Sequence, residues 1–218
     1  MQFDWRCEDG DRGHAGDTVC RVTGQARAIL TAERTALNFL QTLSATATTA
    51  RAYVDAVAGT GATILDTRKT LPGLRAAQKY AVRCGGAKNH RIGLFDAILI
   101  KENHIAAMGS IDAAIDEALK TVESVLVEIE VETIEQVERA LDSHADRLLL
   151  DNFSLEMMRQ AVNLRDNRGS PKDLEASGGV ALDTVRAIAE TGVDYISVGA
   201  MTKSVDAVDF SLRVIQGI

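Results

Sequence analysis

Positively charged residues gather in one stretch of an otherwise acidic chain. Between Asp66 and Lys101 the sequence holds eight Lys or Arg residues and two acids, whereas the whole chain of 218 residues has a formal net charge of -7. The remainder therefore carries about -13. Several of these cations fall where apolar runs end and loops begin, so their side chains can converge on one ligand. The stretch predicts a site for a small and heavily anionic ligand.

The elements that must position these cations repeat one plan from about residue 60 onward. Short runs rich in Ile, Leu and Val stop at polar residues, and an amphipathic stretch follows each. The runs are ATILDTR, AILIKEN, VLVEIEVE, RLLLDNF, DLEASGG and DYISVGA. We interpret them as parallel strands that are apolar on both faces, with helices between them that start at Ser110, Thr133, Ser154 and Asp183. Six such units favour an α/β fold with a (β/α) barrel, TIM-like and either complete or incomplete, over an open doubly wound sheet.

The two ends of the chain depart from this plan. Residues 1–60 hold a turn-rich opening, a short alternating segment at CRVTG and a helical pattern from about Thr31 to Ala58. We expect residues 1–60 to be the remnant of another domain and residues 61–202 to form the barrel. The apolar spacing over residues 203–218 predicts a C-terminal helix that returns to the N-terminal element.

Composition excludes several classes of protein. Apolar residues make up 46% of the chain, which suits an ordinary globular core, and no apolar run reaches the about 18 residues of a membrane span. The opening MQFDWRCEDGD lacks the pattern of a secretion signal, so the cytoplasm is the expected location. A pI near 5.1 and 4% aromatic residues argue against nucleic-acid binding. Three cysteines without metal-ligand spacing predict free thiols at Cys7, Cys20 and Cys84.

The carboxyl ends of barrel strands face the active site, so the residues that end each run are candidates for it. The early strand ends offer cations for anions, and the middle ones offer carboxylates for sugar hydroxyls or for Mg²⁺ on a polyphosphate. The late ones, SGGV and SVGAM, offer backbone N–H groups to a phosphate, unless their glycines only make tight turns. The candidates are Arg68, Lys69, Lys101, Glu130, Asp151, Ser177, Gly178 and Gly199.

Two of the basic-stretch residues have more than one interpretation. Lys101 could bind an anion as a fixed charge, form a Schiff base with a carbonyl substrate, or pair with Glu102 or Asp96. His90 stands beside cations, which disfavour its imidazolium form, so we expect a neutral imidazole that donates to an anionic ligand. The other histidines show no metal-ligand pattern, and we expect His14 and His144 on the surface.

Seven segments together resemble quinolinate phosphoribosyltransferase, the decarboxylating enzyme that makes nicotinate mononucleotide for NAD synthesis. They are TAERTALNFLQ, LDTRKTLPGLRAAQKYAV, GGAKNHRIGLFDAILIKENHI, VEIEVE, LLLDNF, ASGGV and ISVGAMTKS. The resemblance runs from about Trp5 to Phe210, and DTRKTLPGLR with NHRIGL is very specific. It implies phosphoribosyl transfer from phosphoribosyl pyrophosphate to quinolinate, with release of pyrophosphate and CO₂.

The resemblance also implies a role for each site residue. Quinolinate's carboxylates and the pyrophosphate would be bound by Arg68, Lys69, His90, Arg91 and Lys101. The ribose hydroxyls and the Mg²⁺ cofactor would be bound by Glu130 and Asp151, which would be catalytic together with Lys69 and Lys101. The 5′-phosphate would be bound by Ser177, Gly178, Gly199 and Lys203. Arg34 would reach into the site of the neighbouring subunit of a homodimer or higher homo-oligomer.

The chain departs from the family's pattern at its start. Family members begin several dozen residues earlier, with strands of an open-faced α/β sandwich domain that covers the partner's barrel mouth. This chain starts in the last part of that domain, so we expect an N-terminally shortened member. Gly13 and His14 also replace the apolar residue that usually follows DGDR.

Three other functions remain open. One is the molybdenum-associated paralogue of the same fold, against which the intact DTRKT and NHR motifs argue. Another is a lyase that forms a Schiff base on Lys101. The third is an inactive fragment that binds quinolinate without turnover.

Overall fold

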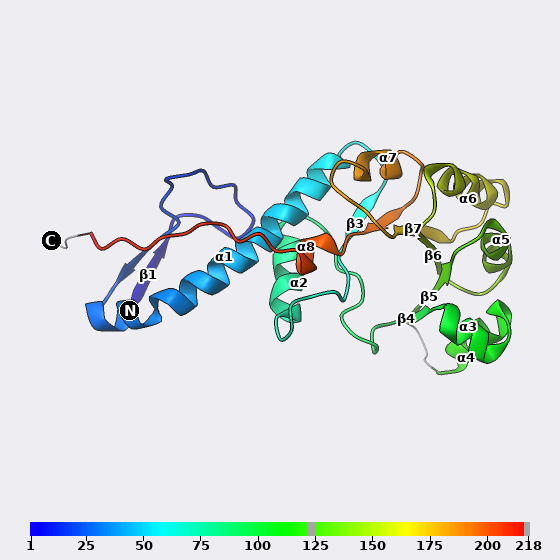
Figure 1. Cartoon of the computed structure of the whole chain (residues 1–218), viewed down its shortest axis with the longest axis horizontal. Coiled ribbons are helices and arrows are strands. Elements are labelled where there is room, and N and C mark those ends of the chain that lie inside the picture. Colours follow the sequence, from blue (N-terminus) through cyan, green and yellow to red (C-terminus); the bar gives the residue numbers. More distant parts are fainter. Residues whose placement is uncertain (122–124, 216–218) are drawn as a thin grey trace.

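The computed structural model describes residues 1–121 and 125–215, and it joins a curved parallel sheet to a long helix and a small hairpin (Figure 1). The sheet has six strands in the order β3-β8-β7-β6-β5-β4. Each apolar run that the sequence singled out forms one of them, so the six predicted strands are confirmed. They are β3 (Thr63–Leu65), β4 (Ala97–Ile100), β5 (Leu126–Val131), β6 (Arg147–Asp151), β7 (Asp173–Ser177) and β8 (Tyr195–Ser197).

The sheet is an incomplete barrel. The first strand, β3, pairs in parallel with the last, β8, as closure of a (β/α) barrel requires. Within the described ranges no strand ladder joins β3 to β4. A loop stands between these two edges instead: Lys88 bridges Leu65, and the Arg91 guanidinium donates to the carbonyl oxygen of Ala97 at 3.2 Å. The predicted TIM-like α/β fold is confirmed in its incomplete form.

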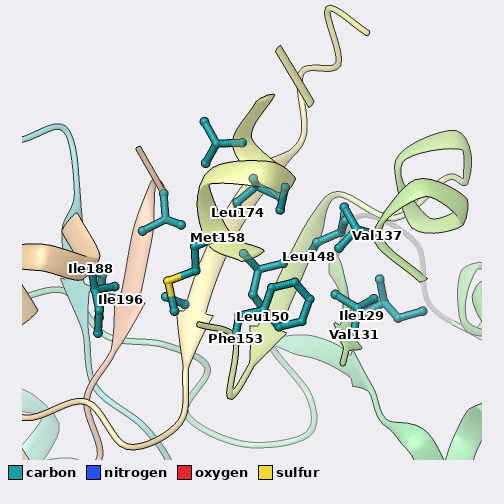
Figure 2. Close-up of a cluster of buried hydrophobic side chains, with 14 of the residues drawn as sticks. Ile129, Val131, Val137, Leu148, Leu150, Phe153, Met158, Leu174, Ile188 and Ile196 are labelled. Atoms are coloured by element: carbon teal, nitrogen blue, oxygen red, sulfur yellow. The ribbon is translucent and has the colours of Figure 1, made fainter. Parts of the chain in front are cut away.

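The two faces of the sheet differ in chemistry. Because successive side chains on a strand point to opposite faces, Val127, Ile129 and Val131 lie under the helices, while Glu128 and Glu130 point the other way. The face under the helices packs against them in a buried apolar core (Figure 2). The strands contribute Ile129, Val131, Leu148, Leu150, Leu174 and Ile196, and the helices and a loop contribute Val137, Met158, Ile188 and Phe153. The interpretation of strands that are apolar on both faces is therefore wrong for β5 and β7, which place Glu128, Glu130 and Glu175 on the inner face. It holds for β4, whose four residues are all apolar.

Three of the four helices with a predicted capping residue begin directly after that residue. The hydroxyl oxygens of Ser110, Thr133 and Ser154 accept backbone N–H groups at 3.1, 3.3 and 3.2 Å, which satisfies donors that a helix start leaves free. The last of the four predicted starts is wrong by one residue, since Thr184 rather than Asp183 precedes α7. The helices are α2 (Arg75–Cys84), α3 (Glu102–Met108), α4 (Ile111–Thr121), α5 (Ile134–Asp142), α6 (Leu155–Asn167), α7 (Val185–Ala189) and α8 (Ala200–Lys203).

The N-terminal part is an antiparallel pair, β1 (Gln2–Trp5) and β2 (Cys20–Thr23), followed by α1 (Ala26–Ala56). Helix α1 begins earlier than the predicted Thr31 and runs from the hairpin to the sheet, where it packs on α2 (Figure 1). The approach is close, because a Cβ atom added to Gly85 would lie 2.4 Å from the carbonyl oxygen of Ala47. The predicted boundary at residue 60 falls in the turn after α1.

The helix predicted over residues 203–218 is wrong within its described part. Helix α8 ends at Lys203, and residues 204–215 run without helix back along α1, where the Gln41 side chain donates to the Phe210 carbonyl oxygen at 3.3 Å. A helix in a protein gains most of its stability by burying an apolar face. Val205, Val208 and Leu212 are partly buried in this extended segment, and the Val208 N–H donates to the Gln41 carbonyl oxygen at 3.2 Å. The segment therefore covers α1 without forming a helix, and only Ile215 of the predicted apolar stripe is exposed. Residues 216–218 lie outside the described residues.

The cysteines, the histidines and the length of the helices also bear on the sequence predictions. All three cysteines are free thiols, as predicted. His14 and His144 are exposed, as predicted, and so is His104. None of the helices in the described part of the chain combines the length and the apolar character that a membrane span needs.

Candidate active site

Two cations follow strands at the carboxyl edge of the incomplete barrel, and a third lies in the loop between these strands. Arg68 follows β3 and is exposed, Lys101 follows β4 and is half-exposed, and Arg91 is partly buried in the loop between these strands. Burial lowers the pKa of Arg91, and repulsion from the Arg68 guanidinium lowers it further, against the pull of Glu128 and Asp96. The two guanidinium groups therefore share one region, which suits a dianionic ligand.

Lys101 has a partner that sequence reasoning did not anticipate. Its ammonium forms an ion pair with the Glu130 carboxylate on the neighbouring strand, whereas Glu102 or Asp96 was the predicted alternative. Burial raises the pKa of Glu130, and the Asp151 carboxylate raises it further, while Lys101 opposes the change. The Glu130 and Asp151 carboxylates are thus close enough to repel each other, and the Lys101 ammonium pairs with Glu130. Such a set of oxygen donors fits a hard divalent cation such as Mg²⁺.

Glycine turns close the same edge after β7 and β8. Gly178 has a φ of +98°, and a Cβ atom added to it would lie 2.2 Å from the Asn152 side-chain oxygen. A Cβ atom on Gly199 would lie 3.4 Å from the Lys69 side chain and 3.9 Å from that of Lys203. The structure thus brings both predicted lysines to the turn after β8, where backbone N–H groups and ammonium groups can bind one phosphate.

His90 lies inside the barrel and is engaged at both ring nitrogens. Its Nδ1 accepts the backbone N–H of Arg91 at 2.8 Å, and its Nε2 lies 2.9 Å from a Glu128 oxygen. Burial lowers the pKa of His90, with a smaller opposing effect from Glu175. The structure agrees with the predicted neutral form. The donor that we assigned to an anionic ligand points at Glu128 instead, which corrects that expectation.

Two buried carboxylates and one guanidinium lie beneath the cation cluster. The Arg147 guanidinium donates to Glu175 at 3.1 Å, and the Ser197 hydroxyl donates to the other Glu175 oxygen at 2.5 Å. Burial, with the Glu128 carboxylate second, raises the pKa of Glu175 to about 7, and burial also raises the pKa of Glu128. Ligand atoms of His90, Glu128 and Glu175 lie within 4.8 Å of one another, as around a metal ion. Their hydrogen bonds and the Arg147 charge account for this spacing without an ion.

Sequence reasoning missed this buried group, although a signal was present. From Val127 to Glu132 the segment VLVEIEVE alternates between apolar and acidic residues, which indicates a strand with one polar face. Glu128 and Glu130 therefore had to share a face, and Glu175 in DLEAS follows the same alternation. No sequence signal identifies Arg147 as the partner of Glu175, because that contact depends on the register of β6 with β7.

Some cations of the basic stretch hold the framework rather than a ligand. Lys79 is 2% exposed and donates to a buried Asp66 oxygen at 2.5 Å and to the His90 carbonyl oxygen at 2.8 Å. Asp66 also accepts the backbone N–H of His90 at 2.8 Å. The Arg75 side chain donates to the carbonyl oxygen of Arg68 at 3.1 Å. These contacts fix the strand end after β3 and the loop that carries Arg91.

Comparison with known proteins agrees with the geometry. Residues 46–213 match the family model of the quinolinate phosphoribosyl transferase C-terminal domain, and residues 1–44 match that of its N-terminal domain. The chain belongs to the quinolinate phosphoribosyltransferase family. The two family models meet within α1, so this one helix belongs to both the N-terminal and the C-terminal domain of the chain.

Named relatives of the quinolinate phosphoribosyltransferase family are similar over nearly the whole chain. A nicotinate-nucleotide pyrophosphorylase (carboxylating) of Mycobacterium leprae is 48% identical over 95% of this chain and 73% of its own length. A quinolinate phosphoribosyltransferase (decarboxylating) of Nicotiana glauca is 42% identical over 98% of this chain and 65% of its own length. The chain thus spans about two thirds to three quarters of these relatives. The predicted family and enzyme class are confirmed.

A solved structure gives the same result for the fold. The nicotinate-nucleotide pyrophosphorylase of Francisella tularensis superimposes with a TM-score of 0.91 at 48% identity, over 95% of this chain and 73% of that one. The NadC structure from Streptococcus pyogenes gives a TM-score of 0.92 at 42% identity, over 98% and 75%. The chain therefore has the same fold as these two solved structures.

Arg34 stands apart from the other candidates. It is exposed on the part of α1 that is nearer to the hairpin. Over residues 1–121 and 125–215, no hydrogen bond or ion pair joins Arg34 to any other residue that we assign to the active site. Its role across a subunit boundary stays a prediction.

The buried Glu175 makes the stability of this family member depend on pH. Its pKa is about 7 in the folded chain against an ordinary 4.5, so the folded state keeps a proton that the unfolded chain releases. The contribution of Glu175 to stability must therefore fall as the pH rises from about 4.5 through 7. Between pH 5 and pH 8 we expect the parent chain to lose roughly 2 kcal/mol more unfolding free energy than Glu175→Gln. Urea titrations at several pH values measure the difference, and parallel profiles would contradict the assignment.

Proposed function

We propose that this chain transfers the phosphoribosyl group of phosphoribosyl pyrophosphate to the ring nitrogen of quinolinate and releases pyrophosphate and CO₂. The product is nicotinate mononucleotide, a precursor of NAD. One observation carries the proposal: the cations after the early strands and the glycine turns after the late strands share one edge of one sheet. That edge can hold a dicarboxylate at one side and a sugar phosphate at the other.

The cations at the early strands bind quinolinate. Two adjacent ring carboxylates need two or more positive groups, and Arg68, Arg91 and Lys101 supply them within one region. Guanidinium groups suit this task because they bind a carboxylate through two parallel hydrogen bonds. His90 lies beneath this cluster and supports it through the backbone of Arg91.

The turns at the late strands bind the 5′-phosphate of the sugar. Ser177, Gly178 and Gly199 offer backbone N–H groups, and the close approach of Lys203 to Gly199 adds a positive charge. Lys69 lies at the same turn, where it can also reach the pyrophosphate. These contacts orient the sugar so that C1 meets the ring nitrogen of quinolinate.

Glu130 and Asp151 hold Mg²⁺ and the ribose hydroxyls. Their mutual repulsion, with Lys101 as the balancing cation, leaves a set of carboxylate oxygens that fits a divalent cation. The bound metal would neutralise charge on the pyrophosphate group. The carboxylates also stabilise the positive charge that develops on the sugar as the C1–O bond to pyrophosphate breaks and the C1–N bond forms.

Decarboxylation then needs little from the chain. The ring nitrogen is positively charged once it carries the sugar, so it stabilises the electron pair that the breaking C–CO₂ bond leaves on the neighbouring ring carbon. That carbon then takes up a proton from solvent after CO₂ has left. Arg68, Arg91 and Lys101 hold the departing carboxylate in place and exclude water from it. This step requires no dedicated general base.

A homodimer in the cytoplasm completes the proposal. Large apolar side chains near the hairpin and near Arg91 are at least half exposed, which suits cover by a second copy of the chain. In such a dimer Arg34 would reach the partner's quinolinate site. The exposed residues are Phe3, Trp5, Phe39, Leu94 and Phe95.

The test is turnover with quinolinate labelled in the carboxylate beside the ring nitrogen, with phosphoribosyl pyrophosphate and Mg²⁺. We expect labelled CO₂ and nicotinate mononucleotide in equal amounts, and neither when phosphoribosyl pyrophosphate is omitted. Binding of quinolinate without product would favour the inactive fragment. A covalent adduct on Lys101 after borohydride treatment would favour the Schiff-base lyase.

A further inference from the structure

The backbone and the side chain of His90 are both fixed by other residues of the chain. Asp66 accepts its backbone N–H at 2.8 Å, and Lys79 donates to its carbonyl oxygen at 2.8 Å. Its Nδ1 accepts the Arg91 N–H at 2.8 Å, and its Nε2 lies 2.9 Å from Glu128. All four polar groups of His90 therefore have a partner within the protein, and none of them is free for a ligand.

These contacts fix the tautomer of the ring. A backbone N–H can only donate, so Nδ1 must present its lone pair to Arg91 and cannot carry a proton. In a neutral imidazole the proton is then on Nε2, which donates to Glu128. Glu128 is thus the acceptor that holds His90 in the tautomer on which the hydrogen bond to Arg91 depends.

Glu128 is itself held in a defined position. It is 0% exposed, lies on β5 opposite Arg147, and belongs to the same buried group as Glu175. Arg147 compensates the charge of Glu175 through a contact of 3.1 Å, and its guanidinium packs over the Tyr195 ring at 3.8 Å. One Glu128 oxygen is buried without a hydrogen-bond partner among the described residues. The other oxygen is the one that faces His90.

We propose that Glu128 is a positioning residue for quinolinate recognition, acting through His90 to fix the backbone of Arg91. This inference rests on the proposed function, because it assumes that Arg91 binds a quinolinate carboxylate. Arg91 is anchored at both ends: its N–H donates to His90, and one guanidinium nitrogen donates to the Ala97 carbonyl oxygen at 3.2 Å. The Arg68 guanidinium is close enough to lower the pKa of Arg91, so the Arg91 side chain lies in the region that we assign to the ligand.

Two substitutions at Glu128 separate positioning from bulk. Glu128→Gln keeps an acceptor oxygen for His90 and can donate its amide hydrogens to Glu175. Glu128→Met has a similar volume but removes the acceptor at 2.9 Å and leaves the His90 Nε2–H only the Glu175 oxygen at 3.5 Å. Glu138→Gln, on the exposed face of α5, is the matched control.

We expect Glu128→Met to raise the KM for quinolinate on the order of tenfold or more. The His90 ring must shift to bond the Glu175 oxygen 3.5 Å away, and this shift disturbs its hydrogen bond to the Arg91 N–H. Its KM for phosphoribosyl pyrophosphate should stay within about twofold, since the glycine turns are untouched. Glu128→Gln should restore the quinolinate KM to within about threefold of the parent. In ¹⁵N spectra of the parent protein the His90 ring should show a proton on Nε2 and none on Nδ1.

Several outcomes would overturn the inference. One is an unchanged KM for quinolinate in Glu128→Met. Another is an equal rise of the KM values for quinolinate and for phosphoribosyl pyrophosphate in Glu128→Met, without recovery in Glu128→Gln, which would indicate a purely structural role. A proton on Nδ1 of His90 in the parent protein contradicts it without any substitution. If the parent chain binds quinolinate but makes no product, the proposed function fails, and dissociation constants for quinolinate still test the positioning role in the same variants.

Discussion

Lys101→Ala should lose quinolinate binding almost completely. The substitution removes a cation from the ligand region, and it also leaves the Glu130 carboxylate without its partner beside an incoming dianion. Breaking one member of such a charge set costs about 2 to 5 kcal/mol, which weakens affinity roughly thirtyfold to several thousandfold. Arg68→Ala should act in the same direction, although Arg68 has no carboxylate partner to release among the described residues. Titration calorimetry with quinolinate measures both effects.

The control for this result is a lysine outside the site. Lys120→Ala removes an ammonium group whose ion pair with Glu117 on α4 is exposed, so quinolinate affinity should stay unchanged. A double variant, Lys101→Ala with Glu130→Gln, should recover part of the affinity because it removes the unpaired carboxylate. Parent-like affinity in Lys101→Ala would refute the assignment of the cation cluster.

Gly178→Ala should impair use of phosphoribosyl pyrophosphate by a factor on the order of a hundred. A Cβ atom at Gly178 would lie 2.2 Å from the Asn152 side-chain oxygen and 2.9 Å from its backbone nitrogen, so the turn after β7 must move. Its φ of +98° adds strain for any residue with a side chain. The displaced N–H groups would no longer meet the 5′-phosphate. Steady-state KM and kcat for phosphoribosyl pyrophosphate, with Tm as a check on folding, measure the effect.

The neighbouring glycine is the matched control. Gly179 has a φ of +59°, and a Cβ atom there would meet no atom within 4 Å. Gly179→Ala should therefore cost only the strain of a left-handed residue, about 1 kcal/mol of stability, with a small change in KM. Equal effects of the two substitutions would show that the turn after β7 does not bind the phosphate.

Strand positions were predictable because they depend on local patterns. The strands end where apolar runs meet residues such as Arg68, Lys101 and Asp151, and parallel strands place these ends at one edge whatever the details of packing. Helix starts at Ser110 and Thr133 were equally local, since a capping hydroxyl bonds within three residues of itself. The location of the site followed from these two regularities.

Contacts between strands were not predictable, because they depend on register. Lys101 pairs with Glu130 rather than Glu102 since β4 and β5 align Ile100 with Ile129, which brings the next residues together. His90 meets Glu128 only because the loop after α2 fills the gap between the two edge strands. The helix predicted for the C-terminal segment is wrong for a related reason, because contacts with Gln41 on α1 hold this segment in an extended form.

A crystal structure of the protein with quinolinate tests the shared binding edge most directly. We expect the two carboxylates of the ligand to contact Arg68, Arg91 and Lys101, with the ring nitrogen turned toward the glycine turns that contain Gly178 and Gly199. His90 should keep its hydrogen bonds to Glu128 and to the Arg91 backbone. Quinolinate bound away from the carboxyl edge of the sheet, or at this edge without contact to any of the three cations, would contradict the proposed site.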